Sequence, residues 1–197
     1  MNILTDALPT SVFIDGQEYG INSDFRAGVE FEMMIEQGEE NIYRLLAPFF
    51  AVRPANIGAA LREVELFFCC GKIPDKEEKP TKSKQAYSFR MDGETVFADF
   101  WRYYGIDLSR EYLHWWVFRA LLSGLPEKSE FKQRVYYRTC DLKGLSKKER
   151  ERIMSIRSRI EIKDKTSSKQ TLEERNAAML SYIAKRAVEI AGGETIV

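Results

Sequence analysis

Cysteine and histidine are scarce in this sequence, with three cysteines and one histidine among 197 residues. Cys69 and Cys70 are adjacent and Cys140 is far from both, so no pair has the CxxC spacing of a zinc or redox site. Adjacent cysteines rarely form a disulfide with each other, so we expect three free thiols, as in a reducing cytoplasm. These absences disfavour a metal centre, and we expect no metal ligand in the chain.

Long hydrophobic runs are also missing. No stretch approaches the roughly 18 apolar residues of a membrane-spanning helix. The first residues, Met-Asn-Ile-Leu-Thr-Asp, lack the basic region followed by an apolar one that begins a secretory signal. We therefore expect a protein that is neither membrane-embedded nor secreted and that works in the cytoplasm.

The motifs of common enzymes are absent as well. The sequence contains no GxGxxG, no GxxxxGK[ST] and no GxSxG. His114 lies in an aromatic stretch, where a buried histidine with satisfied hydrogen bonds is more common than a catalytic base. Glu30, Glu32 and Glu36 follow one helical face, a pattern typical of a solvated surface. We expect no catalytic residue, no cofactor and no enzymatic activity.

The composition is that of a globular protein, with 44% hydrophobic residues, 30% charged residues and a net charge of zero. The charges are unevenly spread. Residues 1–100 hold 10 Lys/Arg and 17 Asp/Glu, whereas residues 132–170 hold 13 Lys/Arg and 5 Asp/Glu. The acidic and basic regions either attract each other or face different partners.

The basic region 132–170 is a candidate for neutralising the phosphates of a nucleic acid. However, acidic residues interleave with its basic ones, as on an ordinary solvated helix: Glu149, Glu151, Glu161 and Asp164. The sequence has neither a zinc module nor an RNA-binding aromatic motif. Nucleic-acid binding is therefore disfavoured and is kept as the alternative function.

The stretch from Ser109 to Ser123 has no Gly or Pro, and Gly124 and Pro126 follow it as stop signals. On a helical wheel of about 100° per residue, most of its circumference is apolar. Two of the chain's three tryptophans lie in it. Its remaining polar arc carries Tyr112, Trp115, Arg119 and Ser123. Because such a helix needs neighbours on several sides, we predict a buried central helix.

Turn and capping signals predict a mainly α fold, a multi-helix globular bundle around this Trp-rich helix with a short N-terminal β-hairpin at Asp15-Gly16. Asp92 and Ser129 are the predicted caps of two helices, and Ser146-Lys-Lys-Glu149 fits the capping-box pattern at the start of another. We predict a core domain over residues 1–145 with a mobile loop at 72–84, followed by amphipathic helices over 146–197 that form an arm or dock on the core. The helices are expected over residues 23–37, 39–50, 54–71, 92–105, 146–162 and 171–191, with a short one beginning at Ser129.

The central stretch also carries a resemblance to a known family. Tyr104-Gly-Ile-Asp-Leu108, followed by Leu113-His-Trp-Trp-Val-Phe-Arg-Ala-Leu-Leu-Ser-Gly-Leu125, resembles the signature of the bacteriophage gene-product-fifteen family. The resemblance covers residues 10–160. Other pieces agree in the same order: Ile21-Asn-Ser-Asp-Phe-Arg26, Phe67-Phe-Cys-Cys-Gly71, Tyr87-Ser-Phe-Arg-Met-Asp92 and Tyr137-Arg-Thr-Cys-Asp-Leu142.

The resemblance implies a protein of tailed phages and prophages of Gram-positive bacteria, with its gene between those of the major tail protein and the tape-measure protein. That position is similar to the place of tail assembly chaperones, which bind the tape-measure protein while the tail tube grows. The implied function is a non-enzymatic tail assembly factor in the host cytoplasm. No catalytic or cofactor-binding residue is carried over from the family.

A chaperone of this kind covers an apolar stripe on a helical partner, which requires an apolar face with a charged rim. The thinly apolar helices over 147–162 and 172–191 are the best local candidates for that face. The predicted contact residues are Ile153, Ile156, Ile160, Leu172, Met179, Leu180 and Ile183. The alternative is that these faces pack on the chain's own core or on a second copy in a homo-oligomer.

Overall fold

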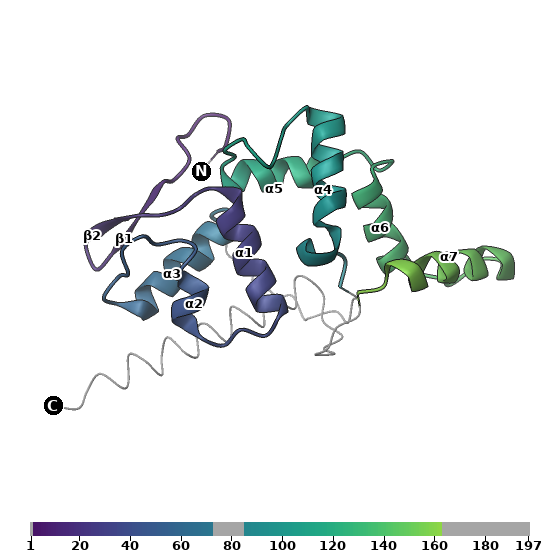
Figure 1. Cartoon of the computed structure of the whole chain (residues 1–197), viewed down its shortest axis with the longest axis horizontal. Coiled ribbons are helices and arrows are strands. Elements are labelled where there is room, and N and C mark those ends of the chain that lie inside the picture. The colour runs from purple at the N-terminus through teal and green to yellow at the C-terminus, as the bar shows by residue number, and fades with distance from the viewer. Residues whose placement is uncertain (1, 73–84, 163–197) are drawn as a thin grey trace. The chain divides into compact units, whose positions relative to one another are not determined.

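The computed structural model describes residues 2–72 and 85–162, and this part of the chain is mainly α-helical (Figure 1). The predicted fold class is confirmed. The predicted loop after Lys72 and the predicted helix over 171–191 lie outside the described residues. No helix in the two described ranges is long and apolar enough to cross a membrane. The elements in chain order are β1 (Ser11–Ile14), β2 (Gln17–Gly20), α1 (Phe25–Glu36), α2 (Ile42–Leu46), α3 (Ile57–Phe68), α4 (Phe89–Tyr104), α5 (Trp115–Gly124), α6 (Glu130–Thr139) and α7 (Lys147–Ile160).

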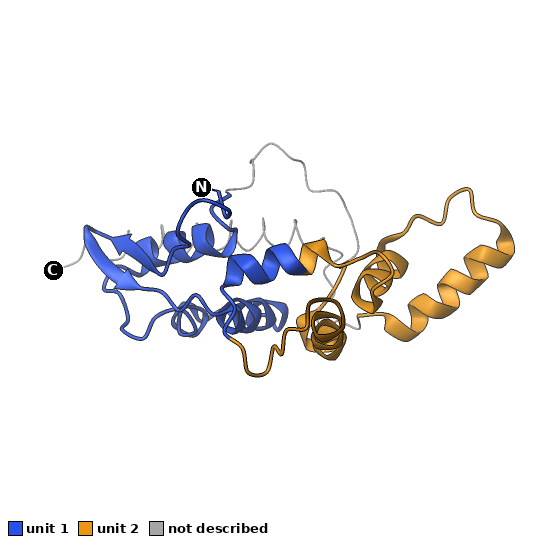
Figure 2. Cartoon of the chain, turned by 90° about the horizontal axis from the view of Figure 1, so that it is seen from above, with its two compact units in different colours: residues 1–79, 112–121, 176–197 blue, residues 80–111, 122–175 orange. Residues whose placement is uncertain are grey.

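The chain divides into two compact units, coloured separately in Figure 2. Of the described elements, unit 1 contains the hairpin, α1, α2, α3 and most of α5. Unit 2 contains α4, the end of α5, α6 and α7. Among the described residues, unit 1 comprises 2–72 and 112–121, and unit 2 comprises 85–111 and 122–162.

The N-terminal hairpin of unit 1 forms where the Asp-Gly pair predicted it. Asp15 and Gly16 have φ angles of 50° and 80°, the left-handed conformation that a two-residue hairpin turn requires. β1 and β2 pair in antiparallel fashion, from Ser11 opposite Gly20 to Ile14 opposite Gln17.

The first three helices begin at short polar side chains. The side chains of Asp24, Asn41 and Asn56 accept N–H groups from the first turns of α1, α2 and α3. α2 is shorter than the predicted helix over 39–50, because Pro48 has no N–H with which to continue the ladder. α3 likewise begins after its Asn56 cap and not at Pro54.

Aromatic rings fill the interior of unit 1. The ring centroid of Phe31 lies 5.2 Å from that of Phe49 and 5.1 Å from that of Phe68, and all three side chains are buried. The Phe68 ring stacks in turn on Trp115 at 5.1 Å. Each such pair adds about 0.5–1.5 kcal/mol to the stabilisation from burial alone.

The structure contains the predicted central helix, but this helix begins later than Ser109 and buries a different face from the predicted one. Residues 113–115 pair with residues 23–25: Phe25 N–H donates to Leu113 O, and Trp115 N–H donates to Ser23 O. This bridge takes the backbone groups that a longer helix would use, so α5 starts at Trp115. Trp115, predicted on the polar arc, is 0% exposed. That prediction was wrong.

The helices of unit 2 follow two of the three predicted caps. Ser129 caps α6, and Ser146 with Glu149 forms the predicted capping box of α7. Asp92 is not the cap of α4: Ser88 holds that position, and Asp92 lies fully buried in the first turn of the helix. α7 groups with α4 and α6, and the arm predicted for residues 146–197 stays a prediction.

Candidate partner-binding surfaces

The two tryptophans of the Leu-His-Trp-Trp signature form hydrogen bonds to carbonyl groups at the end of α3. Trp115 Nε1 donates to the carbonyl oxygen of Phe68 at 2.9 Å, and Trp116 Nε1 donates to that of Phe67 at 2.7 Å. A helix leaves its last carbonyls without intrahelical partners. Two adjacent indoles therefore satisfy carbonyls at the end of α3 and dock α5 there.

His114 is part of the same set of hydrogen bonds. Its Nδ1 accepts the Trp116 N–H at 3.1 Å, which leaves Nε2 as the nitrogen that donates to Pro9 O at 3.0 Å. The ring is buried, and both of its nitrogens are satisfied by the backbone. This agrees with the interpretation of His114 as a satisfied buried side chain.

The packing of Trp115 explains why position 28 is occupied by glycine. A Cβ at Gly28 would lie 2.4 Å from the Trp115 ring, closer than real Cβ contacts come. α1 and α5 approach each other only because this position is glycine.

Glu32 departs from the expected solvated acidic face, because it is buried and its carboxylate lies 3.9 Å from the Arg119 guanidinium. Arg119 also lies over the Trp115 ring, 5.4 Å from its centroid. These contacts join α1 to α5 within unit 1. They give Glu32 a structural role within unit 1.

The surroundings of Cys69 and Cys70 favour the protonated thiol. Cys69, Cys70 and Cys140 are free thiols. Burial, reinforced by the negative charge of Glu65, raises the pKa of Cys69 to about 11. Burial also raises the pKa of Cys70. Thiols that stay protonated are poor nucleophiles and poor metal ligands. Within the described residues no group of His, Cys, Asp and Glu is placed to hold a metal ion.

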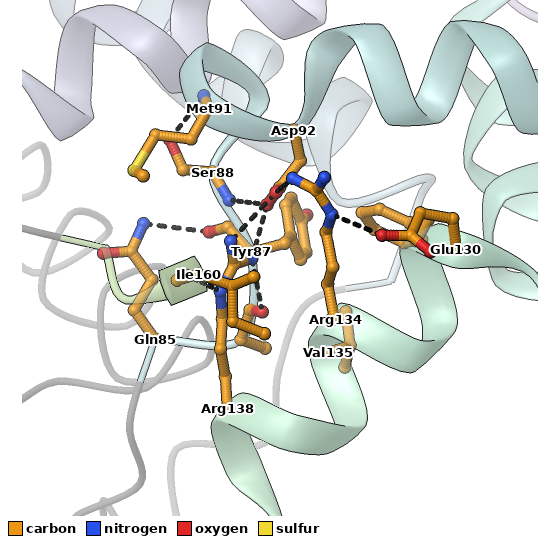
Figure 3. Close-up of polar contacts among 12 residues, drawn as sticks. Gln85, Tyr87, Ser88, Met91, Asp92, Glu130, Arg134, Val135, Arg138 and Ile160 are labelled. Atoms are coloured by element: carbon orange, nitrogen blue, oxygen red, sulfur yellow. Dashed lines mark hydrogen bonds and ion pairs between the residues drawn. The ribbon is translucent and has the colours of Figure 1, made fainter. Parts of the chain in front are cut away.

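Unit 2 is held together by a buried ionic cluster, here called the Asp92 cluster and made of Asp92, Arg134 and Arg138 (Figure 3). Arg138 forms a two-pronged pair with the Asp92 carboxylate, with Nη2 2.9 Å from Oδ1. Arg138 Nε donates to Ile160 O at 2.8 Å. One carboxylate on α4 thus fixes α6, and through Arg138 it fixes the end of α7.

Arg134 completes the Asp92 cluster from one helical turn away. Its Nη1 lies 3.3 Å from Asp92 Oδ1, and its Nε lies 3.1 Å from Glu130 Oε1. Burial lowers the pKa of Arg134, but the hydrogen bonds to Glu130 and Asp92 outweigh it and raise the pKa overall. The arginine therefore stays charged, and Glu130 offsets the second positive charge of the cluster.

A second carboxylate of α4 holds the start of α6. The buried Asp99 accepts the backbone N–H of Phe131 at 2.8 Å and that of Glu130 at 3.4 Å. Carboxylates are favourable at helix N-termini, where N–H groups are unpaired and the helix dipole is positive. Asp92 and Asp99 together turn one face of α4 toward α6.

The opposite face of α4 exposes an aromatic pair, here called the aromatic ledge and made of Phe97 and Trp101. The rings are stacked with centroids 6.4 Å apart. Phe97 is 38% exposed and Trp101 is 54% exposed, whereas Trp116 is 8% exposed. The spacing of Val96, Phe97, Phe100, Trp101 and Tyr104 in the sequence predicts an aromatic face on this helix, but it does not predict which rings reach solvent. A half-exposed tryptophan in a protein that buries its other two is a typical centre of a protein–protein contact.

A second apolar surface lies along α1 in unit 1. It is a groove of about 450 Å³, and its lining combines the apolar Val29 and Met33 with the charged Arg26 and Glu30. Methionine suits adaptable binding surfaces, so this groove is a rival to the aromatic ledge.

The partner-binding residues predicted on α7 are not an exposed apolar face. Ile153 is buried, and Ile156 and Ile160 are half-buried. α7 packs against α6, where Arg157 donates to the carbonyl oxygens of Tyr137 at 2.8 Å and Cys140 at 2.9 Å. Binding of a partner through α7 stays a prediction. The remaining predicted contacts lie outside the described residues: Leu172, Met179, Leu180 and Ile183.

These features define a mainly helical protein whose described surface offers apolar contact areas. The chain belongs to a phage protein family: a family model described as Bacteriophage Gp15 protein matches residues 4–162. This match confirms the resemblance carried by the Leu-His-Trp-Trp stretch. No curated protein and no solved structure matches the chain.

Proposed function

We propose that this protein is a non-enzymatic tail assembly factor that binds the tape-measure protein through the aromatic ledge while the tail forms in the host cytoplasm. The observation that carries the proposal is the exposed stack of Phe97 and Trp101 on α4. The phage family of the chain and the gene order implied by the family resemblance support it.

The ledge has the geometry to receive a helix. Phe97 and Trp101 are four residues apart, so they form one ridge of the kind that packs into the groove of a facing helix. A tape-measure protein is long and helical, and its apolar stripe is exposed to water before the tube encloses it. Tryptophan buries about 150–250 Å² on contact, which makes it an efficient anchor for such a stripe.

The ledge is rigid, which favours binding. Asp92 and Asp99 fix the inner face of α4 to α6 by direct hydrogen bonds. A preformed surface loses less conformational entropy on association than a loose one. The charged side chains around the ledge would set the orientation and the on-rate of the partner: Arg90, Glu94 and Arg102, all exposed.

The test is co-expression of this chain with the tape-measure protein of the same phage. We expect a co-purifying complex that Phe97→Ser with Trp101→Ser reduces at least tenfold. A matched control is Tyr136→Ser with Met154→Ser, which removes two other exposed apolar side chains of unit 2. A complex unaffected by the ledge variant would overturn the proposal.

Two further variants test the rival surfaces. Met33→Asp probes the groove on α1, and Ile156→Asp with Ile183→Asp probes the sites predicted from sequence. We expect both to leave the complex in place, provided circular dichroism shows that they remain folded. Light scattering of the chain alone separates a ledge that binds a partner from one that joins two copies. A ledge variant that only dissolves a homo-oligomer would reject the tape-measure proposal.

A further inference from the structure

Of the six basic residues of α7, Arg157 is half-buried and five are exposed: Lys147, Lys148, Arg150, Arg152 and Arg159. Arg157 faces α6 and is hydrogen-bonded to two backbone carbonyls. Lys148, Arg152 and Arg159 are exposed, and none forms a hydrogen bond or ion pair with another described residue. We infer that these three side chains, the basic row, bind the phosphate backbone of duplex DNA without sequence specificity.

The three charges lie on one line of the helix. At about 100° per residue, Arg152 and Arg159 fall within about 40° of Lys148. At about 1.5 Å per residue, the row is about 16 Å long. Double-stranded DNA carries one charge per about 1.7 Å of its axis, so a row of this length spans several phosphates. Ser155 lies on the same line between the two arginines and adds a hydroxyl donor.

Folding takes the Glu149 carboxylate away from the basic row, whereas the exposed Glu151 lies beside the row. The carboxylate of Glu149 is held in the capping box by the N–H and hydroxyl of Ser146, at 3.1 and 2.7 Å. Glu149 projects about 100° away from Lys148, and Glu151 about 60° to the other side. The row itself therefore carries only positive charge.

The composition of this face favours phosphates over a protein partner. Protein interfaces have an apolar core, with roughly 56–58% non-polar area even in non-obligate complexes. Among the exposed side chains of α7 within about 80° of Lys148 none is apolar: Glu151, Arg152, Ser155, Ser158 and Arg159. The exposed Met154 lies about 120° away. Phosphate contacts need charge and hydroxyl donors and no apolar surface. The inner face is fixed by Arg157, so the row is presented as a rigid edge.

The experiment measures binding of the full chain to a 20-base-pair duplex of random sequence by fluorescence anisotropy between 50 and 200 mM salt, about the range in which counterion release is resolved. Three phosphate contacts predict that log K falls with log salt at a slope of about −2.7. We expect Lys148→Gln with Arg152→Gln and Arg159→Gln to weaken binding at least tenfold at the lowest salt and to remove most of this slope.

The matched control is Arg53→Gln with Arg62→Gln and Lys128→Gln, which removes three exposed positive charges elsewhere. It should bind DNA within twofold of the unaltered chain, and circular dichroism should show equal helix content in both variants. Absence of binding by the unaltered chain would overturn the inference. Equal losses of DNA affinity in both variants would also overturn the inference, because they would show that only the net charge of the protein matters. A row variant that keeps its affinity for DNA but loses the tape-measure protein would reassign the row to an acidic protein surface.

Discussion

Trp115 in unit 1 and Asp92 in unit 2 perform the same task with opposite chemistry. Each is fully buried and each joins three helices or helix ends. Trp115 does so by ring stacking on Phe68 and by one N–H on a carbonyl of α3. Asp92 does so by charge-assisted hydrogen bonds from Arg134 and Arg138.

Apolar packing and a buried ion pair stabilise their units in different ways. Apolar packing stabilises in proportion to the area removed from water and tolerates small rearrangements. A buried ion pair adds little net stability over an apolar replacement, but it is directional and costly to leave half-made. Unit 2 is thereby held in one arrangement in which the outer faces of α4 and α7 stay in solvent.

The largest expected effect is at the tryptophans of unit 1. Trp115→Ala should lower the free energy of unfolding by about 3–5 kcal/mol through lost burial and a cavity, and Trp116→Ala should fall in the same range. Trp101→Ala, on the exposed ledge, should cost under about 1 kcal/mol. Urea denaturation followed by circular dichroism measures all three. Equal midpoints for Trp101→Ala and Trp115→Ala would contradict the assignment of core and surface.

Removing one partner of the Asp92 cluster comes next. Asp92→Ala should cost about 3–5 kcal/mol, because it leaves the buried Arg138 without its carboxylate. Replacing the pair, Asp92→Leu with Arg138→Met, should cost less than Asp92→Ala alone. Urea midpoints of the single and double variants give this comparison. A double variant less stable than the single one would show that the cluster stabilises unit 2 more than apolar packing could.

Gly28→Ala should cost about 1–3 kcal/mol, because the new methyl group collides with the Trp115 ring. Gly93→Ala is the matched control on α4: nothing lies within 4 Å of its added Cβ, so it should stabilise by about 0.5–1 kcal/mol. Thermal melts of both variants test the pair. Destabilisation by Gly93→Ala, or none by Gly28→Ala, would show that the close approach of α1 and α5 is misplaced.

Asp99→Ala should cost about 0.5–2 kcal/mol, as the loss of a helix-terminal acceptor does elsewhere. Glu94→Ala, an exposed carboxylate on the same helix, should change stability by less than about 0.5 kcal/mol. Hydrogen exchange of the Phe131 amide gives a local readout. Its protection should fall in Asp99→Ala and stay unchanged in Glu94→Ala.

The effect on stability that is smallest at neutral pH concerns the thiols of unit 1. Because the pKa of Cys69 is raised from 9.0 to about 11, the folded state keeps this proton where the unfolded chain has lost it. Stability should therefore decline as pH rises from 9 to 11, and alkylation of Cys69 at pH 8 should be far slower in the folded protein than in urea. Mass spectrometry after timed iodoacetamide treatment measures the rate. Equal rates in both states would contradict the buried environment.

Local signals in the sequence determined the elements whose partners lie within a few residues. The Asp-Gly turn, the Ser129 cap and the Ser146–Glu149 capping box each satisfy backbone groups next to them in the chain. The family signature was equally visible, because it is a string of adjacent residues.

Contacts between residues far apart in the sequence determined the other features of the fold. α5 starts at Trp115 only because residues 23–25 occupy the backbone groups of residues 113–115. Asp92 is a buried ion-pair member and not a cap, because Arg138, 46 residues away, reaches it. Periodicity gave α4 an aromatic face, but Asp92 and Asp99, by binding α6, determined that Phe97 and Trp101 point to solvent. The sequence alone thus determined which helices form, and tertiary contacts decided which of their faces remain available for binding, because exposure depends on neighbours that are distant in the chain.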